Sequence, residues 1–291
     1  MLEIIFTLVQ LALVGAALWY TIETRKLRVL SESQMEMLRR QGRLFVAPLL
    51  VLGLFSCVSA SVTTPGQAIQ AVADDRSEPG KYAVEEVYGE WKDSARKGRT
   101  ILWKAYLPKE SKTPAPVVLY SRGGGGNRES NAMLGRHLAS HGFPAFHLQH
   151  EGSDNKAIRA DRRALEAVND PKASEDRFRD VAFAVKSLAD EARTGPLRKR
   201  INPDRVGIAG HSYGALTAQV VAGQVVNGYG QKLAVPELRG AFLLRPSPPR
   251  PAYGDEETSF VKMLMPMFSA TGTADRPPDL SFTAADRTIP F

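Results

Sequence analysis

Residues 206–215 read Val-Gly-Ile-Ala-Gly-His-Ser-Tyr-Gly-Ala, and this stretch decides the fold class. The apolar run that opens it predicts a buried strand, and the residues that follow it have helical composition. Between them lies Gly-x-Ser-x-Gly, the pattern of a nucleophile elbow, which raises a serine on a strained turn between a strand and a helix. Side chains at Gly210 and Gly214 would strike adjacent elements. We therefore predict that Ser212 is a nucleophile; the alternative is a glycine-rich strand end in an ordinary α/β protein.

Strands and helices alternate along the chain from residue 82 onward. This order predicts an α/β fold whose mostly parallel sheet has helices on both faces. The first two strands are separated by a polar turn and suit an antiparallel hairpin at a sheet edge. Besides the elbow unit, we expect strands at 82–88, 99–107, 116–120, 143–149, 240–244 and 266–270, and helices at 130–140 and 173–192.

A glycine-rich loop follows the strand expected at 116–120. It reads Ser-Arg-Gly-Gly-Gly-Gly-Asn over residues 121–127. Four glycines allow backbone N–H groups to point into a cavity. We predict that the N–H groups of Gly124 and Tyr213 form an oxyanion hole around a substrate carbonyl oxygen. A flexible turn and a phosphate cradle are the alternatives, but no Gly-Lys-Ser/Thr follows, which excludes a P-loop.

The acid of a Ser–Asp–His order belongs just past a strand that follows the nucleophile. Asp275 is our candidate, with Asp279 a distant second and a solvated turn aspartate as the alternative. No histidine follows His211, and a serine without an imidazole base is a poor nucleophile at neutral pH. His211 is expected to pack away from the site. His150 is a possible surrogate base, although a role in loop architecture suits it better.

The chain before residue 82 is unlike the rest. Two long apolar runs flank a basic segment, and positive charge stays cytoplasmic. We therefore expect everything after about residue 61 to be exported to the periplasm or exterior of a bacterium, and membrane-anchored or secreted. A signal peptide that starts at Met35 or Met37 is the alternative. The expected segments are a membrane span at 1–23, a basic cytoplasmic segment at 24–43, a second span or signal peptide at 44–62, a linker at 63–81 and an incomplete catalytic-type domain at 82–291.

Composition narrows the possible partners. The formal net charge is +7, and much of it comes from the basic segment near the membrane, so we read it as a topology signal and expect no nucleic-acid partner. The single cysteine, Cys57, excludes an intrachain disulfide and a cysteine-based metal cluster. It lies either in a lipobox-like sequence or simply in an apolar run. We expect no metal and no cofactor.

Several segments, taken in order, resemble the α/β-hydrolase superfamily. They are residues 117–129, 138–143, 150–154, the elbow and 266–275. The closest branch contains predicted dienelactone hydrolases, platelet-activating-factor acetylhydrolases and cutinase-like polyester hydrolases. The resemblance implies an esterase or lipase-like enzyme that uses no cofactor and acts on a small-molecule or lipid-like ester. It also implies that Ser212 is the nucleophile, Asp275 the acid, and Gly124 and Tyr213 the oxyanion donors.

Two departures from that family affect the expected activity. Arg122 stands where the family commonly has histidine, and a guanidinium cannot accept hydrogen bonds as imidazole can. Residues 284–291 resemble the segment that precedes the family's last strand and catalytic histidine. We therefore expect a hydrolase truncated before its last strand and helix, with impaired turnover through a Ser212 acyl-enzyme. The alternatives are a non-catalytic, membrane-tethered ligand-binding domain, and a thioesterase or peptidase on the same fold.

Overall fold

The computed structural model describes residues 77–111, 113–263, 265–275 and 282–290. The segments expected at 1–23, 24–43 and 44–62 lie outside these residues, as do Cys57, Asp279 and most of the expected linker. Within the described ranges, no helix is long and apolar enough to cross a lipid bilayer.

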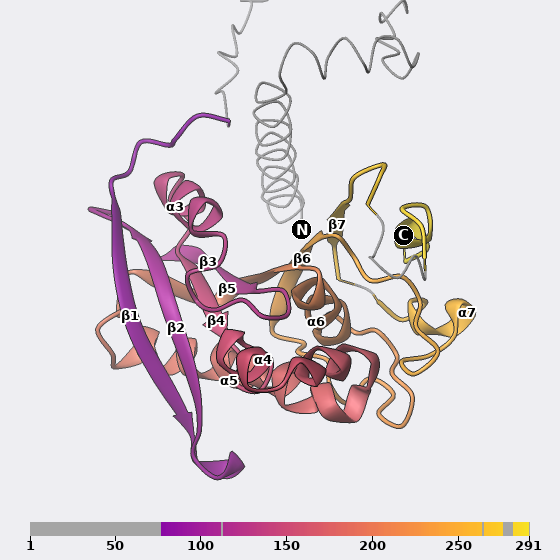
Figure 1. Ribbon diagram of the computed structural model, residues 1–291. Coiled ribbons are helices and arrows are strands. Elements are labelled where there is room, and N and C mark those ends of the chain that lie inside the picture. Colours follow the sequence, from indigo (N-terminus) through magenta and orange to yellow (C-terminus); the bar gives the residue numbers. More distant parts are fainter. Residues whose placement is uncertain (1–76, 112, 264, 276–281, 291) are drawn as a thin grey trace, which may run out of the picture. The chain divides into compact units, whose positions relative to one another are not determined.

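A seven-stranded mixed sheet forms the centre of the fold, in the order β1-β2-β4-β3-β5-β6-β7 (Figure 1). The strands β1 and β2 form an antiparallel hairpin at one edge, β2 is antiparallel to β4, and every other neighbouring pair is parallel. The α/β prediction and the edge hairpin are thus confirmed. The strands are β1 (Val84–Asp93), β2 (Arg99–Pro108), β3 (Ala115–Ser121), β4 (Ala145–Gln149), β5 (Ile201–His211), β6 (Leu238–Leu244) and β7 (Met267–Ala270).

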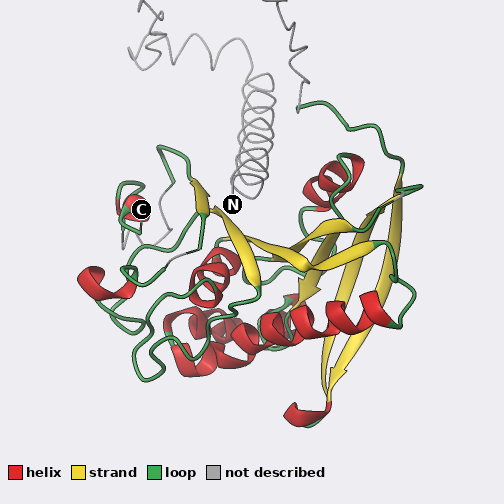
Figure 2. Cartoon of the chain, turned by 180° about the vertical axis from the view of Figure 1, so that it is seen from behind, coloured by secondary structure: helices red, strands yellow, loops and turns green. Residues whose placement is uncertain are grey.

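Helices cover both faces of this sheet, as the alternating pattern predicts. The long helix α5 and the shorter α6 lie against one face, and α3 lies against the other (Figures 1 and 2). Each face has its own apolar cluster, one that includes residues of α5 and α6 and one that includes residues of α3. The helices are α3 (Ala132–Ser140), α4 (Asn155–Ala160), α5 (Pro171–Arg193), α6 (Tyr213–Val221) and α7 (Glu256–Ser259), with 3-10 turns η1 (Ser94–Arg96), η2 (Arg162–Asn169) and η3 (Asp286–Thr288).

Local sequence explains where α5 begins and which face it buries. The Asp170 side chain accepts a hydrogen bond from the Lys172 N–H, and Pro171 occupies the first turn, where its missing N–H costs nothing. Phe178, Val181, Val185 and Leu188 follow at helical spacing and are buried in the core. Burial of each such side chain contributes about 1.5–3 kcal/mol to folding.

The sequence-based prediction missed α4 and η2. This segment is short and highly charged, with only Ile158, Leu165 and Val168 as large apolar residues, so it shows no sustained period. Two aspartates hold its turns: Asp154 accepts from the Ala157 N–H at 2.9 Å and Asp161 from the Arg163 N–H at 2.9 Å. Its conformation therefore depends on side-chain caps rather than on an amphipathic stripe.

Candidate functional site

Ser212 lies on a sharp turn between β5 and α6. Its backbone angles are φ 54° and ψ −117°, a region that residues with a side chain rarely adopt and that surrounding structure must hold. Backbone hydrogen bonds hold it: its N–H donates to the Leu244 carbonyl at 3.0 Å, and its carbonyl accepts from the N–H groups of Ala215 at 2.8 Å and Leu216 at 3.1 Å. The strand–turn–helix context predicted for the elbow is confirmed.

The two elbow glycines are required by close packing. A Cβ on Gly210 would collide with the carbonyl oxygen of Gly214. A Cβ on Gly214 would collide with the carbonyl oxygens of Ser121 and Arg122. The second contact crosses from the elbow to the glycine-rich loop, so Gly214 lets the turn at Ser212 lie directly against the loop after β3.

The same packing brings the predicted oxyanion residues together. A Cβ on Gly123 would lie 3.6 Å from Ser212 Cβ, and a Cβ on Gly124 would lie 3.7 Å from Tyr213 Cδ1. Tyr213 is the first residue of α6, whose N-terminus carries partial positive charge. The loop and the helix N-terminus therefore flank Ser212 from two elements that are distant in sequence.

Arg122 supports the loop in a way that differs from our expectation. Its side chain is fully buried, and it donates from Nη1 to the carbonyl oxygens of Gly123 (2.8 Å) and Ser153 (2.9 Å) and from Nη2 to that of His150 (2.7 Å). Burial lowers the pKa of Arg122 to about 10. The Arg122 guanidinium cannot accept a hydrogen bond as an imidazole can, but it donates to three backbone carbonyls. The loop is therefore supported.

A second buried guanidinium, Arg177 of α5, joins the loop to α6. Its plane lies over the Tyr213 ring, with Cζ 4.3 Å from the ring centroid. Its donors reach Thr217 Oγ1 on α6 (2.7 Å, from Nε), Ser153 Oγ (2.8 Å, from Nη1), and Ser121 Oγ (3.0 Å) together with the Arg122 carbonyl oxygen (both from Nη2). Because one rigid, planar group makes all these contacts, it fixes the spacing between the glycine-rich loop and α6.

His150 belongs to this network rather than to the nucleophile. Its Nδ1 lies 3.0 Å from Asp180 Oδ2 and its Nε2 lies 3.0 Å from Ser121 Oγ, and all three residues are fully buried. The Asp180 carboxylate can only accept, so His150 Nδ1–H donates to it. Nε2 of the neutral ring then accepts from the Ser121 hydroxyl, whose oxygen accepts from Arg177. Burial and the Arg177 charge lower the pKa of His150 to about 3, so it is neutral.

Asp180 is the anion at the end of this chain of hydrogen bonds. Burial raises its pKa, but hydrogen bonds from His150 and Arg99 outweigh that effect and bring the pKa to about 2. Arg99 Nε and Arg96 Nη1 lie 2.7 and 2.8 Å from Asp180 Oδ1. Sequence reasoning missed Arg177 and Asp180. These two charged residues lie beside Phe178 and Val181 on the apolar face of α5, and that position could have indicated them as buried polar groups.

Asp275 follows β7, as predicted, but its partners are guanidinium groups. Arg245 donates from Nε to Oδ1 at 2.7 Å, Thr271 Oγ1 lies 2.9 Å from Oδ2, and Arg287 Nε lies 3.3 Å from Oδ2. Burial raises the pKa of Asp275, and the hydrogen bonds from Arg245 and Thr271 outweigh it and lower the pKa. Arg245 directly follows Leu244, whose carbonyl binds the Ser212 N–H, so this ion-pair cluster adjoins the elbow.

His211 does not pack away from the loop as expected. A Cβ on Gly123 would lie 3.3 Å from His211 Nδ1, so the ring borders the same glycine as Ser212. Burial and the Arg245 charge lower its pKa. Among the described residues, no hydrogen bond links an imidazole to the Ser212 hydroxyl.

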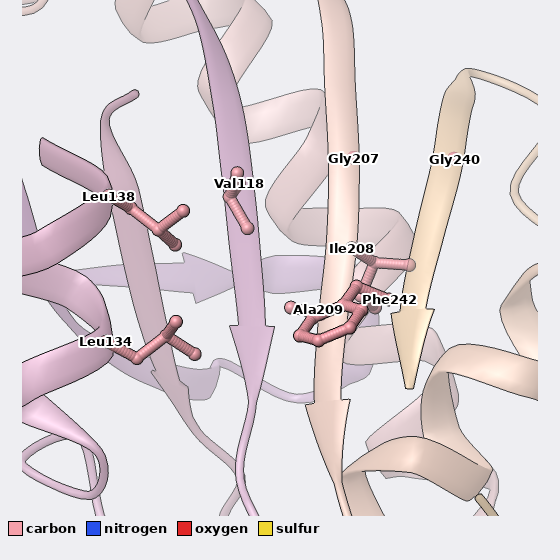
Figure 3. Close-up of a pocket in the computed structure, with 8 residues that line it drawn as sticks. All are labelled: Val118, Leu134, Leu138, Gly207, Ile208, Ala209, Gly240 and Phe242. Carbon is pink, nitrogen blue, oxygen red and sulfur yellow. The ribbon is translucent and has the colours of Figure 1, made fainter. Parts of the chain in front are cut away.

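Two cavities lie away from the elbow. An apolar one of about 20 Å³ lies between α3 and the sheet, where Leu134 and Leu138 face Val118, Ala209 and Phe242 (Figure 3). A larger, polar cleft of about 700 Å³ lies beside the β1–β2 hairpin and is lined by residues of both charges. The first is too small for a substrate, and Ser212 lines neither.

Within the described part of the chain, no cluster of three or more His, Cys, Asp or Glu side chains is placed to hold a metal ion. No protein-family profile matches the sequence, and no curated protein matches it significantly.

Proposed function

We propose that this chain is a serine hydrolase of the α/β-hydrolase superfamily that acts on carboxylic esters. The observation that carries the proposal is the backbone of Ser212, held at φ 54° between β5 and α6 with the glycine-rich loop packed against it. Backbone strain of this kind costs about 1–3 kcal/mol and is concentrated at functional sites. An ordinary strand end has no need of it.

The chemistry follows from what surrounds Ser212. Its Oγ attacks the ester carbonyl carbon, and the carbonyl oxygen becomes an anion. The N–H groups of Gly124 and Tyr213 stabilise that anion from the loop and from the α6 N-terminus. The C–O bond to the alcohol breaks as the Ser212 hydroxyl proton passes through solvent water to the leaving alkoxide oxygen. Water then adds to the acyl-serine carbonyl, which releases the acid and returns a proton to Ser212 Oγ. Arg122 and Arg177 act in this scheme by holding the two donors at a fixed spacing.

A specific observation favours a second candidate, a non-catalytic domain that binds esters. Arg245, Arg287 and Thr271 bind the Asp275 carboxylate. In a catalytic triad, the acid would instead bind and orient an imidazole. In this candidate Ser212 stays a neutral hydroxyl that binds the ester carbonyl without attacking it. Serine hydrolases that lack one triad member still accelerate hydrolysis by about 10³–10⁴-fold over water, so the two candidates differ measurably.

An alkyl fluorophosphonate probe separates these candidates, because it forms a covalent bond only with an activated serine. We expect the full chain to be labelled at Ser212, located by peptide mass spectrometry, and to hydrolyse p-nitrophenyl butanoate. Ser212→Ala should abolish both signals, whereas Ser94→Ala, at an exposed serine on η1, should change neither. Absence of labelling together with retained ester binding would overturn the hydrolase proposal in favour of the binding domain.

A further inference from the structure

The segment formed by α4 and η2 lies beside the glycine-rich loop. Two backbone hydrogen bonds join the start of this segment to the loop: Gly125 N–H to the Ser153 carbonyl at 3.0 Å, and Asn155 N–H to the Gly126 carbonyl at 3.1 Å. Its other end is fixed by Ser174 Oγ, 2.6 Å from the Ala167 carbonyl oxygen. The segment is therefore held in place against the proposed oxyanion loop.

Two apolar side chains of this segment touch the loop glycines. A Cβ on Gly124 would lie only 2.7 Å from Leu165 Cδ2, and a Cβ on Gly125 would lie 3.2 Å from Ile158 Cδ1. We call Ile158 and Leu165 the apolar rim. A group attached to a carbonyl bound at the Gly124 N–H lies within a few bonds of this rim.

Leu165 is 41% exposed, and it is a large apolar side chain in a segment whose other residues are almost all charged or small. Val168, in the same 3-10 segment, packs against the core, whereas Leu165 is not among the residues packed there. An exposed leucine alone is ordinary, but this one touches the candidate oxyanion donor. Covering it with an apolar ligand group would remove its remaining surface from water, which favours binding.

We propose that Leu165, with Ile158, binds the hydrocarbon chain of the ester substrate and selects esters with longer chains over shorter ones; this rests on the proposed function of Ser212. The glycines at 124 and 125 make the contact possible because any larger residue would displace the rim. Leu165 is thus a specificity-determining residue that the sequence pattern does not reveal.

Binding of methyl esters to the Ser212→Ala full chain tests this, because that variant separates affinity from turnover. Affinities for methyl butanoate and methyl hexanoate are measured by saturation-transfer NMR titration. Each methylene buried on the rim tightens binding by up to about fourfold, so we expect about a tenfold tighter dissociation constant for hexanoate. Adding Leu165→Ala should reduce this ratio to about twofold, and adding Leu165→Asp should abolish it.

Val261→Ala is the matched control. Val261 is 68% exposed, and its neighbour Lys262 lies by Gly223, beyond the far end of α6 from Ser212, so the tenfold ratio should persist. Equal affinity for both esters, or equal effects of the Leu165 and Val261 substitutions, would overturn the inference. Chain-length selection without fluorophosphonate labelling of the wild type would instead overturn hydrolysis alone and leave the rim assignment intact.

Discussion

The imidazole of His150 lies 3.0 Å from the carboxylate of Asp180, and neither side chain reaches solvent. With Ser121 on its other nitrogen, His150 completes a Ser–His–Asp chain of hydrogen bonds that resembles a catalytic triad but is sealed inside the protein. Its geometry supports the glycine-rich loop instead of activating a nucleophile. Its electrostatics have a measurable consequence for stability.

Acid should destabilise the fold through this pair. The pKa of His150 is about 3 when folded and near 6.5 when unfolded, so the unfolded chain binds the extra proton first. The contribution of neutral His150 to the free energy of unfolding is complete above about pH 6.5 and is lost as the pH falls toward 3. The loss between pH 7 and pH 5 is about 2 kcal/mol. Asp180, with a pKa of about 2, adds a loss in the same direction below about pH 4.

Urea unfolding at pH 7 and pH 5 measures this effect. His147 is also buried with its pKa lowered to about 4, so it contributes a similar amount. The lowered pKa of His211 adds a further loss of the same sign, so we expect His150→Gln to remove about a third to a half of the wild-type loss of unfolding free energy over this interval. An unchanged pH dependence in His150→Gln would show that this imidazole is not buried in its neutral form.

Arg177→Met should destabilise the protein by about 3–5 kcal/mol. The substitution removes a buried donor and leaves the hydroxyls of Ser121, Ser153 and Thr217 without it. Arg177→Lys keeps the charge but not the planar fork and should recover only part of the loss. Arg136→Met, at an exposed surface pair with Glu86, should change the free energy of unfolding by less than about 1 kcal/mol. Equal losses at positions 136 and 177 would contradict the bridging role.

Gly214→Ala should prevent correct packing of the elbow. Its new methyl group would collide with two backbone carbonyl oxygens, which cannot move without shifting β3 and the loop after it. We expect a loss of at least about 3 kcal/mol in thermal or urea unfolding. Gly207→Ala on β5, the strand before the elbow, is the control, since its Cβ would meet only the Gly240 carbonyl oxygen at 3.4 Å, and it should cost about 1 kcal/mol or less.

Asp275→Asn should weaken the cluster next to the elbow. Arg287 is nearly buried and would keep its charge without a carboxylate, whereas Arg245 is 38% exposed and can turn to water. We expect a loss of about 2 kcal/mol, below the cost of a fully buried pair. Asp161→Asn, which disturbs only an exposed pair with Arg163, should have little effect. A stability unchanged by Asp275→Asn would mean that solvent replaces this carboxylate at both arginines.

Local sequence was enough to place most of the fold. The hairpin, the central strands, α5 and the elbow unit follow from the period of apolar residues and from glycine and proline, which act over a few neighbouring residues. The ends of some predicted strands differ from the observed ones where the chemistry of a single residue outweighs the pattern of apolar residues. The strand predicted at 143–149 begins at Ala145 because Pro144 has no N–H to donate to a ladder.

The candidate site likewise combines residues that local sequence indicates with contacts that only tertiary packing creates. Ser212, Gly124 and Tyr213 could be named as candidates from sequence because the elbow and the glycine-rich loop each carry their own backbone requirement, and their roles remain predictions. The pairing of Asp275 with Arg245, the support given by Arg122 to Ser153 and the contact of Leu165 with Gly124 join segments about 30 to 40 residues apart. The spacing of apolar residues along the chain does not indicate such long-range pairs.

By itself, then, the sequence determined that a serine would be raised between a strand and a helix, because backbone strain needs glycine at fixed offsets. Only the tertiary structure decided which imidazole, guanidinium and carboxylate groups meet. Burial selects those partners: once α5 and the loops exclude water, each polar group must take the nearest complementary one, and that neighbour is set by packing rather than by position along the chain.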